Sequence, residues 1–352
     1  MELQRFLDQN DNYLTLFKEH HLIVKRDRKN NLCLVKNKYD KPIDFQDEND
    51  SWKMYCRGAI INTETNQVVC LPPVKAREIN HDEIDSSDHE IQELIDGTMV
   101  NLFYHKDQWM ISTRSEIGGY NKWLNKKSFR TLFDECCKIH YEELNPLHSY
   151  SFVMRHIENR NVSPIAMNEL YLVEVYSFEE GIQRFSQDDY PKQFLSYNIL
   201  ATVPDLSNVP FSTKGYTLKK DSQRYKIINP KFTYVKELKM NHNTLMYNYL
   251  ELRKNGALKE YLQYFPEHCY VFGSYRDKVH NLSNDLYSTY KNTYIYKNNE
   301  KKEIPYHLKP LIREIHQQYL STKNPTTWDN IKDYIYKLPS KKLMFAMNHS
   351  SQ

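Results

Sequence analysis

Apolar residues in the first two-thirds of the chain fall into short runs that polar turns separate, a pattern typical of β-strands. Residues 55–62 and 67–71 are two such runs, and the polar segment 63–66 lies between them. This arrangement predicts a β-hairpin with a four-residue connection. Residues 97–104 and 109–113 flank a second polar turn in the same way and predict a second hairpin.

Helical periodicity first appears within residues 128–137, which predict a helix, whereas residues 150–154 and 169–176 predict further strands. In the last third of the chain the apolar positions recur at helical spacing throughout. The predicted helical stripes are Leu245, Tyr249 and Leu252; Leu258, Leu262 and Phe265; Val271, Tyr275, Val279, Leu282, Leu286 and Tyr290; Leu308, Leu311, Ile312, Ile315 and Tyr319; and Trp328, Ile331, Tyr334 and Ile335.

The change of period predicts an α+β fold in two domains. Residues 1–234 form a module of mainly antiparallel sheet, and residues 235–352 form an α-helical domain. The charge divides at the same place. The first segment carries 30 basic and 34 acidic residues and the second carries 18 and 11, so a net charge of +7 is concentrated in the helical part. A basic domain of this kind favours an anionic partner.

Composition excludes several classes of protein. The chain has 352 residues with 40% hydrophobic residues, which suffices for a core, and no apolar run is long enough to cross a bilayer. The first residues have no apolar segment typical of a secretory signal. No CxxC or HExxH motif occurs, which argues against a dedicated zinc site and favours reduced thiols. Neither GxGxxG nor GxxxxGK is present.

Only eight glycines occur, so their positions are informative. Four sites begin or follow a predicted strand: Arg57-Gly58, Asp96-Gly97, Gly118-Gly119 and Lys214-Gly215. The sharpest is Asp96-Gly97-Thr98, in which an acid, a glycine and a small hydroxyl residue open the second hairpin.

In this order the motifs resemble those of the covalent nucleotidyltransferase superfamily of RNA ligases, DNA ligases and mRNA capping guanylyltransferases. The similarity is greatest to the RNA-ligase branch, and in particular to RNA-ligase-like proteins of large DNA viruses. It covers about residues 50–235 and rests on the following segments: Tyr55-Cys56-Arg57-Gly58, Leu94-Ile95-Asp96-Gly97-Thr98, Ser112-Thr113-Arg114-Ser115, residues 151–162, Lys214-Gly215-Tyr216, and residues 224–230.

The resemblance implies a nucleotidyltransferase-like sheet module and a nucleotide-binding cleft. The residues that it places at this cleft are Arg57, Gly58, Asp96, Gly97, Thr98, Arg114, Arg155, Lys214 and Lys226. The five cations among them would form a positive pocket for a nucleotide, an RNA 5′ phosphate or a nucleic-acid backbone. The carboxylate of Asp96 is alternatively explained as the cap of its own turn.

The chain departs from the family pattern at the positions that carry the chemistry. The lysine that attacks the nucleotide α-phosphate in the family is replaced by Leu94, which has no amine. Two family glutamates that help to hold magnesium are replaced by Arg155 and Lys214, and the second lysine of a Lys-x-Lys motif is replaced by Ile228. Because Mg²⁺ needs anionic oxygens, no metal site is expected. Lys75 is the best candidate for a displaced nucleophile.

Three hypotheses follow. In the first, the chain is a degenerate RNA-ligase-like protein without catalysis that binds nucleotide or RNA. The second is an active RNA ligase or capping-type nucleotidyltransferase that uses a displaced nucleophile, and only this one calls for ATP or GTP and magnesium. The third is a virion structural or scaffolding protein, for which side chains such as Leu94 and Met154 would fill the cleft.

The resemblance to viral proteins also gives an expected location and partner. We expect the host cytoplasm (a viral factory) or the virion, with no secretion and no membrane partner. A protein partner would bind the C-terminal helical domain, residues 235–352.

Overall fold

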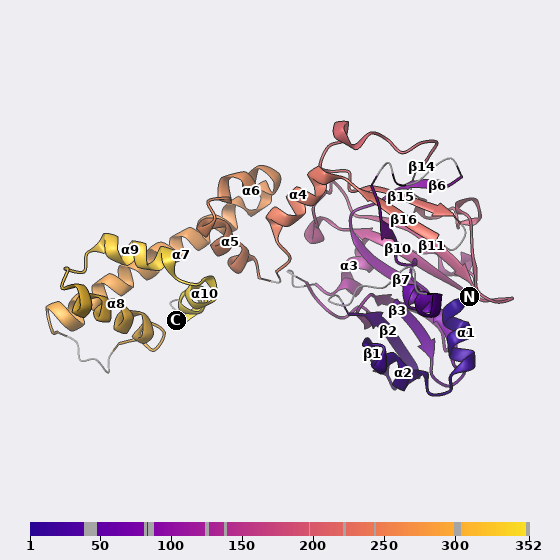
Figure 1. Ribbon diagram of the computed structural model, residues 1–352, viewed down its shortest axis with the longest axis horizontal. Coiled ribbons are helices and arrows are strands. Elements are labelled where there is room, and N and C mark those ends of the chain that lie inside the picture. Colours follow the sequence, from indigo (N-terminus) through magenta and orange to yellow (C-terminus); the bar gives the residue numbers. More distant parts are fainter. Residues whose placement is uncertain are drawn as a thin grey trace. The chain divides into compact units, whose positions relative to one another are not determined.

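The structure is a computed structural model that describes residues 1–38, 48–80, 83, 88–123, 127–136, 139–196, 198–220, 223–242, 244–298 and 304–349. The chain divides into two compact units, Met1–Lys236 and Glu237–Gln352. The sequence-based boundary lies between residues 234 and 235. Sheets dominate the first unit and helices the second, so the predicted α+β class is confirmed (Figure 1).

The first sheet is built from the first predicted hairpin and a second hairpin that precedes it in the chain. Its order is β1 (Leu22–Asp27), β2 (Leu32–Asn37), β3 (Arg57–Asn62) and β4 (Gln67–Cys70), and all its pairs are antiparallel. The helices α1 (Glu2–Gln9) and α2 (Tyr13–Glu19) and the 3₁₀ segment η1 (Glu48–Tyr55) share its core. Leu7, Phe17, Trp52 and Ile61 are buried there. The predicted hairpin of β3 and β4 is therefore confirmed.

The second sheet contains the second predicted hairpin, β7 (Thr98–His105) and β8 (Gln108–Thr113). The order β12-β11-β10-β7-β8-β9 is antiparallel, whereas β13 pairs with β11 in parallel. The remaining strands are β9 (Glu116–Ile117), β10 (His148–Arg155), β11 (Glu169–Ser177), β12 (Gln183–Arg184) and β13 (Leu195–Ser196). The predicted strands 150–154 and 169–176 are confirmed within β10 and β11.

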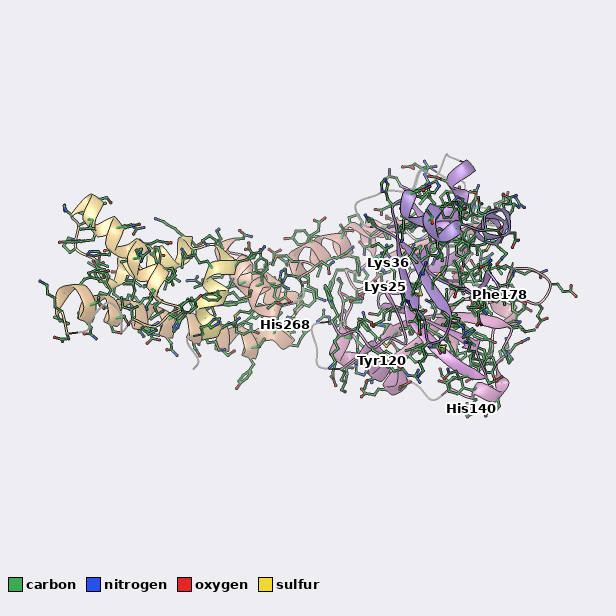
Figure 2. The ribbon with its side chains drawn as sticks, turned by 90° about the horizontal axis from the view of Figure 1, so that it is seen from below. Lys25, Lys36, Tyr120, His140, Phe178 and His268 are labelled. Atoms are coloured by element: carbon green, nitrogen blue, oxygen red, sulfur yellow. The ribbon has the colours of Figure 1, made fainter. Side chains whose placement is uncertain are left out.

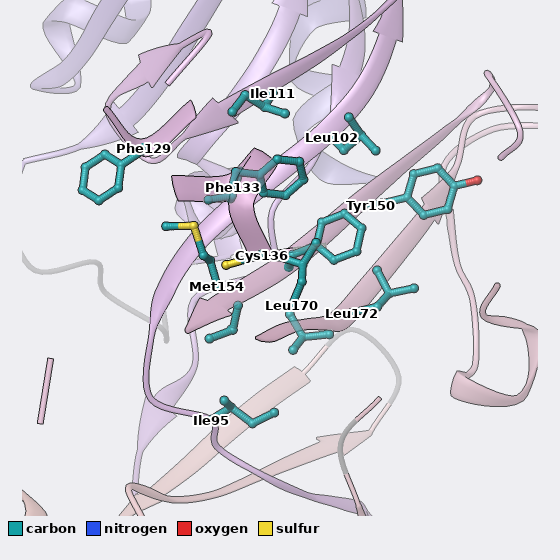
Figure 3. Close-up of a cluster of buried hydrophobic side chains, with 14 of the residues drawn as sticks. Ile95, Leu102, Ile111, Phe129, Phe133, Cys136, Tyr150, Met154, Leu170 and Leu172 are labelled. Atoms are coloured by element: carbon teal, nitrogen blue, oxygen red, sulfur yellow. The ribbon is translucent and has the colours of Figure 1, made fainter. Parts of the chain in front are cut away.

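Helix α3 (Phe129–Cys136) packs on this second sheet and confirms the predicted helix, except that Cys137 lies outside the described residues. Leu132 and Phe133 are buried because helical spacing brings them onto one face. They share a core with Phe152 and Met154 of β10 (Figure 3). Met154 is fully buried in this core.

A third sheet has the order β14-β6-β15-β16-β5. Its strands are β14 (Ile199–Leu200), β6 (Glu90–Glu93), β15 (Gly215–Lys220), β16 (Gln223–Ile228) and β5 (Arg77–Glu78). The pair of β16 with β5 is parallel and the other pairs are antiparallel. Short 3₁₀ segments connect the strands of the unit: η3 (Tyr141–Glu143), η4 (Ile157–Asn159), η5 (Gln187–Asp189) and η6 (Leu206–Asn208).

Helix α4 (Pro230–Lys239) crosses the division between the units, and the second unit is helical. Its elements are α5 (Leu245–Lys254), α6 (Leu258–Tyr264), η7 (Pro266–His268), α7 (Cys269–Tyr290), the π-helical η8 (Lys291–Ile295), α8 (Lys309–Thr322), α9 (Trp328–Lys337) and α10 (Ser340–His349). Most residues of the predicted stripes are buried or partly buried, with Leu282, Leu286, Ile312 and Ile331 fully enclosed, whereas Tyr319 is 37% exposed. Among the helices that the structure describes, none combines the length and apolar character that a bilayer span requires.

Candidate anion-binding cleft

A hollow of about 750 Å³ in the first unit, termed the cleft, brings together residues that are far apart in the sequence. Residues of β3, β7, β15, β16 and α4 line it. Five residues that the family resemblance assigned to a nucleotide site are among them: Arg57, Gly97, Arg114, Lys214 and Lys226. Leu94 and Lys75 line the same hollow.

The lining of the cleft is strongly basic. Of the described residues that line it, eight are basic and two are acidic. The basic residues are Lys38, Arg57, Lys75, Arg114, Lys214, Arg224, Lys226 and Lys236, and the acidic ones are Glu78 and Glu93. Glu78 is already engaged by Lys226, with 2.7 Å between Oε2 and Nζ. Like charges gathered on the walls of a hollow produce a positive potential that attracts anions.

Gly58 brings two of the arginines of the cleft, Arg57 and Arg114, to the same wall. Its φ of +105° is a conformation that side chains disfavour, and a Cβ there would lie 2.9 Å from the Cα of Arg114. The absence of a side chain therefore lets β3 approach the segment between β8 and β9. This approach places Arg114 beside the strand that begins with Arg57.

Lys75 lies on the cleft wall after the turn that ends β4, and its backbone N–H donates to the carbonyl of Met54 at 3.1 Å. Burial lowers the pKa of the Lys75 amine. The positive charges of Arg57, Arg114 and Lys226 lower this pKa further. Neighbouring cations disfavour the protonated form of the amine, and an anion bound in the cleft would raise the pKa again.

Lys214 reaches the segment in which the family carries its nucleophile. The N–H of Leu94 donates to the carbonyl of Gly215 at 2.9 Å, so the two segments run side by side. Lys214 Nζ lies 3.5 Å from the carbonyl oxygen of Ile95 and 4.0 Å from Oδ1 of Asp96. Burial lowers the pKa of Lys214, although Asp96 partly offsets this.

Asp96 is a structural anchor in this fold. Its carboxylate is buried, and Oδ2 accepts the backbone N–H groups of Val162 and Ser163 at 2.9 and 3.0 Å. The sequence favoured a cap of its own turn, but the groups that it satisfies belong to a loop more than sixty residues away. The next position, 97, requires a glycine because a Cβ there would lie 2.5 Å from the carbonyl oxygen of Met154.

The structure does not place Gly58, Asp96, Thr98 or Arg155 among the described residues that line the cleft. The hydroxyl of Thr98 accepts the amide N–H of Asn159 at 2.9 Å. Arg155 forms a salt bridge with Glu169 at 2.9 Å and donates to the carbonyl of Pro164 at 2.7 Å. The sequence assigned Arg155 to the cleft by resemblance alone, and its acidic partner on β11 explains the difference.

Several cleft cations were not found from the sequence. Arg224 occupies the same face of β16 as Lys226 and Ile228, so the two-residue period of a strand could have indicated it. Lys38 and Lys236 carry no such signal. Lys36 on β2 (Figure 2) does not line the cleft, but its amine donates to the hydroxyl of Ser115, the residue after Arg114, at 2.6 Å. Burial lowers the pKa of this amine, and the charges of Lys25 and Arg114 lower it further.

A buried hydroxyl on the wall of the cleft lacks a hydrogen-bond partner among the described residues. Thr217 is 1% exposed, and its hydroxyl makes no hydrogen bond within the described part of the chain. A buried hydroxyl without a partner costs free energy, so an acceptor from a ligand would stabilise it. Across the residues that the structure describes, no three His, Cys, Asp or Glu side chains are grouped so as to hold a metal ion.

Comparison with known proteins gives distant relatives. No protein-family model matches this chain. It is 25% identical over 267 residues to "Immediate-early protein ICP-46 homolog" of Invertebrate iridescent virus 3, a match that covers 71% of this chain and 58% of that protein. The chain thus spans less than two-thirds of the length of this curated relative.

Two solved structures are similar in part. One is a putative ATP-dependent DNA ligase from Aquifex aeolicus, with a TM-score of 0.42, 14% identity, and coverage of 89% of this chain and 80% of that one. The other is an RNA ligase of Naegleria gruberi, with a TM-score of 0.30, 11% identity, and coverage of 44% of this chain and 52% of that one.

Proposed function

We propose that this protein is a degenerate RNA-ligase-like protein whose cleft binds the phosphates of a nucleotide or of RNA without forming a covalent intermediate. The observation that carries the proposal is the lining of the cleft, with eight basic residues against two acidic ones in a hollow of about 750 Å³. That volume suits a ligand the size of a nucleotide. The unpartnered Thr217 hydroxyl supplies a neutral donor beside the cations.

The absence of covalent chemistry is argued from position 94. The side chain that lines the cleft there is a leucine, which has no lone pair to attack phosphorus. The residues present also do not fit magnesium, because Arg155 is paired with Glu169 and Lys214 stands where the family has a second carboxylate. A cleft lined by cations repels a divalent metal ion and attracts the negatively charged phosphate groups of a ligand.

The proposal is tested by measuring the affinity of the whole chain for a mixed-sequence single-stranded RNA over a range of salt concentrations. Each cation that contacts a phosphate releases counterions, so log K falls linearly with log salt. Arg57→Gln and Lys226→Gln are each expected to weaken binding about three- to tenfold and to reduce the slope by about 1.

Lys220→Gln is the matched control for this experiment. Lys220 lies on β15 but not on the cleft, and it is 45% exposed and paired loosely with Asp88 at 3.5 Å. This variant is expected to bind RNA as the parent chain does. If the two cleft variants keep the parent affinity and slope, the cleft is not the binding site.

The alternative of an active nucleotidyltransferase is favoured by one observation, the lowered pKa of Lys75 on the cleft wall. A neutral amine would attack the α-phosphorus of ATP or GTP, a P–N bond would form, and the P–O bond to pyrophosphate would break as pyrophosphate leaves. Under this alternative the protein becomes covalently labelled by the nucleotide, and Lys75→Ala abolishes the label.

The scaffolding alternative requires a cleft that side chains have filled. Met154 is buried in the core of the second sheet and Leu94 lines a hollow that stays open, which supports ligand binding over this alternative. A purely structural protein would bind neither nucleotide nor RNA in the experiments above.

A further inference from the structure

A second and smaller hollow in the first unit, of about 270 Å³, shares Arg224 with the cleft. Residues of β11, β12, β15 and β16 line it, together with Tyr55 of η1 and the first two residues of the chain. Glu174 of β11 is the buried carboxylate of this hollow, which is termed the Glu174 pocket. The family resemblance assigned no site residue to this pocket, although Tyr55 and Arg224 belong to segments that carry the resemblance.

The contacts of Lys219 and Arg184 with the carboxylate of Glu174 are longer than typical charge-assisted hydrogen bonds. Lys219 Nζ lies 3.2 and 3.3 Å from the two carboxylate oxygens of Glu174, and both side chains are 2% exposed. Arg184 approaches the same carboxylate only to 3.6 Å. Charge-assisted hydrogen bonds are normally about 2.7–2.9 Å long. A single carboxylate is therefore shared between two cations without a short bond to either.

The side chains of the pocket carry many donors, and one buried donor lacks an acceptor among the described residues. An ammonium offers three N–H groups and each guanidinium offers five. Lys219 also donates to the carbonyl of Val173 at 3.3 Å, whereas the buried Nε of Arg224 has no acceptor within the described residues. The second carboxylate of the lining, Glu2, is hydrogen-bonded with Tyr55. Buried donors of this kind are usually satisfied, so the pocket has room and donors for an oxyanion.

The pKa of Lys219 reflects first its burial and then the charges around it. Burial lowers this pKa to about 8, and the charges of Arg224 and Arg184 contribute to the lowering. The carboxylates of Glu174 and Glu90 oppose this effect but do not cancel it. An additional anion in the pocket would stabilise the charged form of Lys219.

We propose that the Glu174 pocket binds a single phosphate-class oxyanion through Lys219, Arg184 and Arg224. Two guanidinium groups and an ammonium around one hollow suit the several oxygens of a tetrahedral anion. The volume of about 270 Å³ lies below the usual range for larger ligands, which favours a small anion over a whole nucleotide. This site is separate from the nucleotide proposal, although Arg224 borders both hollows.

The test is calorimetric titration of the full chain with inorganic phosphate, repeated with acetate. Phosphate is expected to bind and acetate to bind at least roughly tenfold more weakly, because it offers fewer oxygens and less charge. Arg184→Gln is expected to weaken phosphate binding by roughly tenfold or more, since a charge-assisted contact is lost. Lys220→Gln, on the same strand as Lys219 but paired with Asp88, is expected to leave it unchanged.

Arg184 is the chosen position because it is half-buried on the two-residue strand β12, so its replacement disturbs the fold less than replacement of the buried Lys219. If Arg184→Gln fails to fold, Arg184→Lys is used instead. It keeps the positive charge but lacks the planar guanidinium group, so a smaller loss of affinity for phosphate is expected. Retained RNA binding in either variant shows that the cleft is intact. Absence of phosphate binding, equal binding of acetate, or unchanged binding in both Arg184 variants overturns the proposal.

Discussion

At the scale of single residues, the chemistry of the cleft depends on which side chain stands at a few positions. Leu94 removes the amine at the place where the family resemblance expects a nucleophile, and Lys214 puts an amine within 4.0 Å of Asp96 from the neighbouring segment. Position 214 therefore gains a positive charge where the family has a negative one. Under the proposed function, these differences from the family pattern favour the binding of anions over metal-assisted transfer.

Gly215 offers a direct test of the backbone geometry that presents Lys214. Its φ is +143°, and a Cβ there would lie 2.1 Å from the carbonyl oxygen of Ile227 on the paired strand. Gly215→Ala is expected to lower the free energy of unfolding by about 2–4 kcal/mol, because neither backbone can move aside. Urea unfolding followed by tryptophan fluorescence measures the change.

Gly273→Ala is the matched control for that substitution. Gly273 lies within α7, and no atom comes within 4 Å of the place where its Cβ would stand. Alanine there is expected to raise stability by about 0.5–1 kcal/mol, since glycine is a poor helix residue. A loss of equal size in both variants would show that the crowding at Gly215 is not as described.

How far the site could be predicted from sequence also depends on single residues. Arg57, Arg114, Lys214 and Lys226 were identified because each lies in a short segment with a recognisable glycine, strand or lysine pattern. Arg155 was placed in the cleft although Glu169 binds it, a contact that depends on the pairing of β10 with β11. Tertiary pairing of that kind leaves no mark in the local sequence.

At the scale of elements, periodicity predicted the strands and helices with long, regular patterns. The two hairpins, α3 and the buried stripes of α5 to α9 are present where the apolar spacing indicated them. The elements α1, α2, β1 and β2 were not predicted. Helix α1 buries only Leu3 and Leu7, which is too few positions to establish a period. Helix α10 was also not predicted, although Pro339 stands directly before its first residue, a place that suits proline.

The start of α9 gives a prediction at this scale. Its cap residue Thr327 accepts the N–H of Asn330, and the side chain of Asn330 accepts the N–H of Thr327 at 2.9 Å, which completes a capping box. Thr327→Ala is expected to lower the free energy of unfolding of the second unit by about 1 kcal/mol. Thr327→Ser keeps the hydroxyl and is expected to retain most of the stability. Urea unfolding followed by circular dichroism measures both, and equal losses would argue against the cap.

At the scale of the whole molecule, the local charge of the cleft has the opposite sign to the net charge of the segment that contains most of it. Residues 1–234 carry four more acidic than basic residues, yet this segment supplies seven of the eight cations and both carboxylates that line the cleft, and Lys236 supplies the eighth cation. The folded chain therefore concentrates positive charge at one place on a unit that is acidic in total. Fields of this kind steer an anionic ligand to the cleft and weaken as salt is added.

The central claim is that the cleft binds phosphate groups without a covalent bond to the protein. The most direct measurement incubates the whole chain with ATP or GTP radiolabelled at the α-phosphate and a divalent cation, and then compares retention on a native filter with retention on a denaturing gel. We expect label on the native filter that falls in Arg57→Gln and no label on the denaturing gel. A labelled band that survives denaturation, or no retention on either, would contradict this account.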